Sequence, residues 1–125
     1  YVYGRCWRKH IDDVQDDIIK LRQSFNAGRI HCENNGDKGY LAKELRRRGE
    51  RSISYHEDMN KYLKITSYLK FEWPNVRFVA GTDPAYIDQI TEYTEEAEHD
   101  DAPDSLACMI RALWKKRDTY TPLWN

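Results

Sequence analysis

This 125-residue chain lacks several sequence features that would assign it to a particular class of protein. There are only three cysteines and no CxxC pair, so neither a disulfide framework nor a cysteine-rich zinc site is expected, and the thiols are predicted to be reduced. No stretch of 18 apolar residues and no signal-peptide pattern occurs, which predicts a protein that is made in the cytoplasm and does not enter a membrane. The phosphate-binding loop GxxxxGK[ST] is also missing, so no P-loop ATPase is expected.

The chain also lacks an excess of charge of either sign. Twenty lysines and arginines stand against 21 aspartates and glutamates, so no strong positive field indicates a nucleic-acid partner. Basic residues are nevertheless concentrated in LRRRGER (45–51) and WKKR (114–117), and such runs are more often solvated helix ends than binding surfaces. With 40% hydrophobic residues, a chain of this length suits one small globular domain.

Strand-like and helix-like segments alternate along the chain. Val14, Ile18 and Leu21 recur at helical spacing, whereas SISY (52–55) has the composition of a strand. The expected strands are 1–8, 29–33, 52–55 and 76–80, and the expected helices are about 12–28, 40–48, 62–73, 84–90 and 102–116. This alternation predicts an α/β domain with parallel strand pairing.

The most unusual segment is HDDAPDSL, immediately ahead of the last apolar helical run. Asp101 as a helix cap, Pro103 in the first turn and Asp104 beside it would make a good helix start, because carboxylates interact favourably with the helix dipole. His99 and Asp100 are not needed for that purpose, and crowded carboxylates repel one another. A divalent cation would relieve the repulsion, so the segment alone leaves a helix cap and a metal site equally open.

A further carboxylate, Glu33, lies where an expected strand ends and a glycine-containing loop begins. Open α/β sheets place their ligand sites at this end of their strands, although a solvated acid is also common there. Together with the Asp-x-x-Asp at positions 101 and 104, Glu33 would offer the hard oxygen ligands that suit Mg²⁺ or Mn²⁺. Two such ions polarise a phosphodiester and activate water, which is nuclease chemistry.

These segments carry a family resemblance. IHCENNGDKGYLAKELRRRG, NKYLKI and HDDAPDSLA, in this order, resemble the C-terminal nuclease domain of the terminase large subunit of tailed bacteriophages, and the resemblance covers about residues 1–114. It implies an RNase H-like mixed sheet flanked by helices and a metal-dependent endonuclease. Such an enzyme cleaves concatemeric double-stranded DNA during packaging in the host bacterial cytoplasm. An ATPase domain, the small terminase subunit and the portal are the implied partners.

The resemblance also implies roles for particular residues. Glu33, Asp101 and Asp104 match the family's catalytic metal ligands for Mg²⁺ or Mn²⁺. His99 and Asp100 are expected to support these ligands without binding the metal. Two lysines, Lys61 and Lys64, resemble a basic pair that contacts DNA phosphates, although solvated helix lysines are the commoner case.

One departure from the family concerns the beginning of the chain. YVYGRCWR resembles the third strand of the family's sheet, so the first two strands, and the catalytic Asp of the first, are expected to be missing. We therefore expect a partial nuclease domain over 1–116, N-terminally truncated and impaired in activity, followed by a tail over 117–125. The edges left unpaired predict either marginal stability or self-association.

Two other functions remain open on the sequence. A resolvase or transposase-like nuclease of the same fold would use the same carboxylates on branched or transposon-end DNA. A non-catalytic remnant would bind DNA or a packaging partner without cleaving it.

Overall fold

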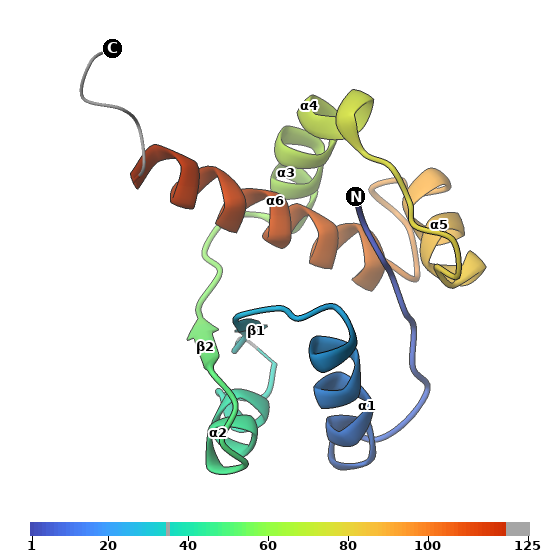
Figure 1. The fold of residues 1–125 in the computed structure, drawn as a ribbon. Coiled ribbons are helices and arrows are strands. Elements are labelled where there is room, and N and C mark those ends of the chain that lie inside the picture. The colour runs from blue at the N-terminus through green and yellow to red at the C-terminus, as the bar shows by residue number, and fades with distance from the viewer. Residues whose placement is uncertain (35, 120–125) are drawn as a thin grey trace. The chain divides into compact units, whose positions relative to one another are not determined.

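The computed structural model describes residues 1–34 and 36–119, and the side chains of those as far as Lys115. Helices and a two-stranded parallel sheet make up the described chain, which confirms the α/β class. The elements are α1 (Ile11–Ser24), β1 (Ile30–Glu33), α2 (Tyr40–Arg47), β2 (Ser52–Tyr55), α3 (Lys61–Lys64), a π-helical segment (Ile65–Leu69), α4 (Lys70–Glu72), a 3-10 turn (Trp73–Asn75), α5 (Pro84–Thr91) and α6 (Asp101–Thr119) (Figure 1). None of the described helices combines the length and the apolar character that a bilayer crossing needs.

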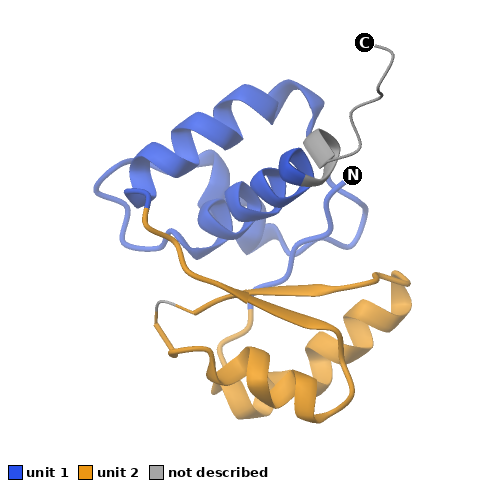
Figure 2. Ribbon diagram, turned by 90° about the vertical axis from the view of Figure 1, so that its left-hand side faces the viewer, with its two compact units in different colours: residues 1–6, 59–125 blue, residues 7–58 orange. Residues whose placement is uncertain are grey.

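The chain divides into two compact units, which Figure 2 distinguishes by colour. Unit 1 consists of residues 1–6 and the chain from residue 59 onward, and unit 2 consists of residues 7–58. Unit 2 is therefore inserted, in sequence, between two parts of unit 1.

Unit 2 is a β1–β2 pair with helices α1 and α2 on one of its faces. The strands run parallel, with Ile30 opposite Ser52 and Glu33 opposite Tyr55. The apolar residues on the covered face form the core of this unit: Cys32, Ala42 and Leu45 are buried, and Ile18, Ile19, Ile30 and Leu41 pack against them. The order helix, strand, helix, strand brings the carboxyl ends of both strands to one edge, where Glu33 lies.

The loop between β1 and α2 shows why the second helix begins where it does. The Asp37 carboxylate accepts hydrogen bonds from the backbone N–H groups of Gly39 (2.8 Å) and Leu41 (3.1 Å), so it satisfies donors that the first turn leaves unpaired. Gly39 has φ of +84°, a conformation that glycine adopts without steric cost. Gly49, with φ of +88°, follows the helix, and glycine commonly ends helices in this left-handed conformation.

Unit 1 is built around α6. The buried side chains of α6 pack against those of α5 and of the helical stretch from α3 to α4. Figure 1 shows this stretch as a nearly continuous helix beside α6. The core of unit 1 contains Val2, Ile65, Leu69, Tyr86, Ile90, Ala102, Leu106, Ala107 and Ile110. The helical spacing of Leu106, Ile110 and Leu113 predicts one inward-facing stripe. Leu106 and Ile110 are confirmed as core, but Leu113 is 57% exposed, so the prediction is wrong for that residue.

The two outer strands that the sequence predicts, 1–8 and 76–80, are wrong as strands. Val2 and Phe78 form one isolated parallel bridge, in which the N–H of Val2 donates to Arg77 and that of Val79 donates back to Val2. After this bridge the first segment turns to the start of α5, where the N–H of Asp83 donates to the Gly4 carbonyl at 2.9 Å. The Gly4 carbonyl thus bonds to the start of a helix and not to a neighbouring strand, so the strand pairing ends there.

The C-terminal boundary also differs from the prediction. Helix α6 continues to Thr119, so the first three residues of the expected tail over 117–125 are helical. The remainder of that tail, 120–125, lies outside the described residues.

Candidate functional site

The acidic segment begins α6 differently from the expected Asp101 cap. Asp101 is the first helical residue and is exposed. The carbonyl of Asp100 accepts the first helical bond, from the N–H of Asp104 at 3.1 Å. The N–H of Ala102 donates to Oε1 of Gln89 on α5, also at 3.1 Å, so a neighbouring helix satisfies one of the donors at the helix start.

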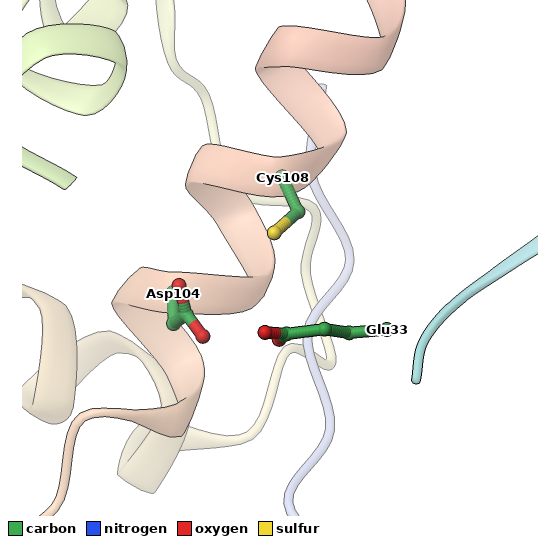
Figure 3. A group of neighbouring side chains, drawn as sticks. All are labelled: Glu33, Asp104 and Cys108. Carbon is green, nitrogen blue, oxygen red and sulfur yellow. The ribbon is translucent and has the colours of Figure 1, made fainter. Parts of the chain in front are cut away.

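Asp104 lies in a buried ion pair. Its side chain is 8% exposed, and its Oδ1 lies 2.5 Å from Nζ of Lys64, whose side chain is 1% exposed. The same lysine nitrogen lies 3.4 Å from Sγ of Cys108, one turn further along α6. Figure 3 shows the side chains of Asp104 and Cys108 projecting from successive turns of this helix. Lys64 is therefore the centre of the polar cluster under α6.

A second lysine lies at the rim of the same cluster. Nζ of Lys61 is 3.3 Å from Oδ1 of Asp100 and 3.8 Å from Oδ2 of Asp104, and its side chain is 46% exposed. Asp101 is close enough to contribute to the electrostatic environment of Lys61. Three carboxylates and two ammonium groups thus gather at the start of α6.

The pKa values of both lysines are shifted by these surroundings. Burial lowers the pKa of Lys61, but the negative charges of Asp104 and Asp100 outweigh it, so that pKa is raised above 10.5. Burial also lowers the pKa of Lys64, and contact with the Asp104 carboxylate and with Cys108 reverses this shift, again raising it. Both lysines are consequently positively charged at neutral pH.

These lysines change the interpretation of the crowded acids. The repulsion among Asp100, Asp101 and Asp104 is relieved by two ammonium groups, which the sequence reasoning did not consider. The shortest of these contacts joins the buried Lys64 ammonium to Oδ1 of Asp104, so this oxygen is already neutralised by a partner within the protein. Because a carboxylate oxygen has two lone pairs, Oδ1 can accept a further ligand beside the Lys64 ammonium.

Glu33 lies in unit 2, as the last residue of β1. It is half-buried and opposite Tyr55 in the strand register. The loop that follows is held to the sheet by the N–H of Asn34, which donates to the Tyr55 carbonyl at 2.9 Å, and by the Asn34 side chain, which donates to Ser54 Oγ at 2.9 Å. The expected position of Glu33, at the carboxyl end of a parallel strand, is confirmed.

Figure 3 draws three side chains, Glu33, Asp104 and Cys108, each of a type that can ligate a metal ion. Within unit 1, a carboxylate oxygen of Asp104 and Sγ of Cys108 lie within 4.8 Å of each other. Carboxylate oxygens fit Mg²⁺ or Mn²⁺, whereas a thiolate suits softer ions such as Zn²⁺. Because Lys64 contacts both groups of unit 1, a cation there must displace its ammonium or bind beside it.

The other predicted site residues differ in exposure. His99 is exposed, and Asp100 is half-buried through its pair with Lys61. Lys61 retains an accessible ammonium group, as a phosphate contact requires, but Lys64 is buried against Asp104. The burial of Lys64 favours charge neutralisation over DNA contact.

Sequence reasoning missed Cys108 and Gln89. Cys108 follows Asp104 by four residues, so helical spacing alone places the two on one face of the last helix. The role of Gln89 had no local signal, because it depends on how α5 packs against α6.

Comparison with known proteins adds no relative: no family model, curated protein or solved structure matches this chain significantly.

Proposed function

We propose that the chain is a metal-dependent DNA endonuclease domain of the phage-terminase type, with an RNase H-like fold. Asp104 carries this proposal, because it is a carboxylate only 6% exposed and one of its oxygens lies within 4.8 Å of the Cys108 sulfur, a second group able to ligate a metal. An aspartate that served only the helix dipole would gain nothing from such burial, since exposed acids interact equally well with a helix terminus.

Charge at the start of α6 supports a cation. Asp100, Asp101 and Asp104 supply three negative charges, and the two lysines that face them supply two positive charges, so the group retains one net negative charge. Proximity to a retained negative charge favours a divalent cation over an anion.

Each residue has a proposed role. Glu33, Asp101 and Asp104 are the carboxylates that hold Mg²⁺ or Mn²⁺, and His99 and Asp100 support them. Lys61, whose ammonium group is accessible, contacts a DNA phosphate, and Lys64 neutralises Asp104 when no metal is bound. The bound metal would polarise the phosphodiester and generate the attacking hydroxide. The proposed substrate is concatemeric double-stranded DNA, with an ATPase domain, the small terminase subunit and the portal as partners.

The decisive experiment combines metal binding with cleavage. We would titrate Mn²⁺ by calorimetry and incubate supercoiled plasmid with the protein in Mn²⁺ or Mg²⁺, using wild type, Glu33→Ala and Asp104→Asn. Asp88→Asn is the matched control, because Asp88 is exposed on α5 outside the cluster. We expect both site variants to lose Mn²⁺ binding and any cleavage, and the control to keep both.

Other outcomes separate the alternatives. Cleavage that persists in both site variants would overturn the assignment. Loss of Mn²⁺ binding in Asp104→Asn but not in Glu33→Ala would remove Glu33 from the site. Preference for a four-way junction over linear duplex would indicate a resolvase, and plasmid binding without Mn²⁺ affinity or cleavage would indicate a non-catalytic protein.

A further inference from the structure

The basic run 45–51 has no part in the proposed catalytic site. In the fold it lies where α2 ends and β2 begins, at one edge of the sheet. Helix α1 ends before β1 and α2 ends before β2, so both helix C-termini and the amino ends of both strands meet at one edge of the sheet in unit 2. This edge is opposite, along the strands, to the one where Glu33 lies. We call it the basic edge and define it by Arg29, Arg46 and Arg51.

Most of the arginines near this edge have a structural explanation. Arg22 pairs with Glu50 at 2.6 Å, Arg47 pairs with Glu44 at 3.3 Å, and Arg48 pairs with Asp16. Arg22 and Arg47 also lie in the last turns of their helices, where positive charge is favourable. These three need no ligand.

Arg29 and Arg51 have no such explanation. Each immediately precedes a strand, and because Ile30 is opposite Ser52, the two arginines are neighbours across the parallel pair. The N–H of Ile30 donates to the Arg51 carbonyl at 2.9 Å, which fixes this register. Both side chains are exposed, and among the described residues neither has an acidic partner in an ion pair. Like charges on neighbouring strands repel, so an anion that binds both arginines would be stabilised there.

The geometry favours a nucleic-acid backbone as that anion. Arg46, the third member, has one guanidinium nitrogen committed to the Ser52 carbonyl at 3.2 Å and lies at the same edge. Side chains alternate along a strand, so Arg29 and Arg51 share the face of Ile53, opposite to the one that α1 and α2 cover. Arginine binds phosphate through paired N–H donors, so the two neighbouring arginines of this face can contact adjacent backbone phosphates, and Arg46 reaches the same edge from α2.

We propose that the basic edge binds the phosphate backbone of duplex DNA, at the end of the strands opposite to Glu33. The choice of DNA rests on the proposed function, whereas the phosphate-binding surface rests on the arginines alone. The surface would hold the duplex in register without reading its sequence, because phosphate contacts carry no base information.

The test is the salt dependence of binding. Fluorescence anisotropy of a labelled duplex would be measured in EDTA, so that neither metal nor cleavage contributes. Each phosphate contact contributes about 0.9 to the slope of log Kobs against log salt, so Arg29→Ala/Arg51→Ala should reduce the slope by about 1.8. The control is Lys20→Ala/Lys70→Ala, which removes two exposed positive charges from α1 and α4. The control should leave the slope unchanged.

Two results of this assay would overturn the proposal: an unchanged slope in the Arg29→Ala/Arg51→Ala variant, or an equal change in the control. A third would come from a parallel assay with phosphatidylserine vesicles, if the arginine variant lost vesicle binding but kept duplex binding. The last would indicate a membrane surface instead. Arg29→Lys/Arg51→Lys, which keeps the charge, should restore most of the slope and excludes misfolding as the cause. Because this assay needs no metal, a reduced slope with neither Mn²⁺ binding nor cleavage would reject the proposed nuclease while keeping the basic edge. An unchanged slope with Mn²⁺ binding intact would reject the basic edge alone.

Discussion

Lys64 and Asp104 form a buried ion pair in unit 1. A buried ion pair is costly to break, because the remaining charge has no solvent to replace its partner. Both side chains are nearly inaccessible, at 1% and 8% exposed. The pair therefore has a structural role whether or not Asp104 also binds a metal.

Removing one partner of this pair should destabilise the protein strongly. We expect Lys64→Ala to lower the free energy of unfolding by about 3 kcal/mol, the cost typical of a buried charge left alone. The double variant Lys64→Met/Asp104→Leu should recover much of the loss, since no charge then remains buried. Urea denaturation of the wild type, Lys64→Met, Asp104→Leu and the double variant measures the coupling energy between the two side chains. Additive effects of the single variants would mean that the two groups do not interact.

The raised lysine pKa values predict a stability change at high pH. Since Lys61 and Lys64 bind their protons more tightly in the folded state, their stabilising effect is fully present below pH 10.5 and is lost as the pH rises through the folded-state pKa values. We expect the melting temperature of the wild type to fall more steeply above pH 10.5 than that of Asp104→Asn. Parallel curves for the two proteins would contradict the linkage.

At the scale of elements, the sequence predicted the helices well and the isolated strands poorly. Periodic apolar residues placed α1, α2, α5 and α6 close to their observed bounds, because each helix satisfies its own backbone. The segments 1–8 and 76–80 have strand-like composition but gain only the Val2–Phe78 bridge, since a strand depends on a partner elsewhere in the chain.

The candidate site was predictable in part for the same reason. The sequence identified Asp104 as the start of a helix and Glu33 as a strand end, and both placements depend on local pattern. The burial of Lys64, its contact with Asp104 and the capping of Ala102 by Gln89 depend on the packing of one helix against another. The residues adjacent in sequence to each partner do not indicate such contacts.

The opening segment offers a test of how tightly elements pack in unit 1. A methyl group added to Gly4 would lie 2.2 Å from the Tyr86 ring, which is buried in the core. We expect Gly4→Ala to lower the free energy of unfolding by about 1–3 kcal/mol through overpacking. Gly28→Ala is the matched control, because a methyl group there meets nothing within 4 Å. Equal melting temperatures for the two variants would show that Gly4 does not pack against Tyr86 in solution.

For the whole molecule, the small sheet has consequences beyond its own unit. Among the described residues β1 and β2 pair only with each other, so each has an edge without a hydrogen-bonded neighbour. Ile53, 37% exposed, lies on β2. Exposed strand edges with apolar side chains promote pairing between chains.

We therefore expect the protein to self-associate as its concentration rises. Ile53→Lys should weaken this association, because a charge on an edge strand opposes pairing. Leu113→Lys makes the same change at an apolar position that is 57% exposed on α6, and it should leave the association unchanged. Sedimentation velocity over a range of concentrations measures the effect, and a wild type that stays monomeric throughout would refute the expectation.

The insertion of unit 2 between residue 6 and residue 59 also sets an order of events during synthesis on the ribosome. The N–H of Val2 cannot reach its acceptor until Arg77 has been made, whereas every partner within unit 2 is available once Asp58 has emerged. The chain from residue 59 onward must then return to residues 1–6. During translation the inserted unit can therefore fold first, and unit 1 closes after it.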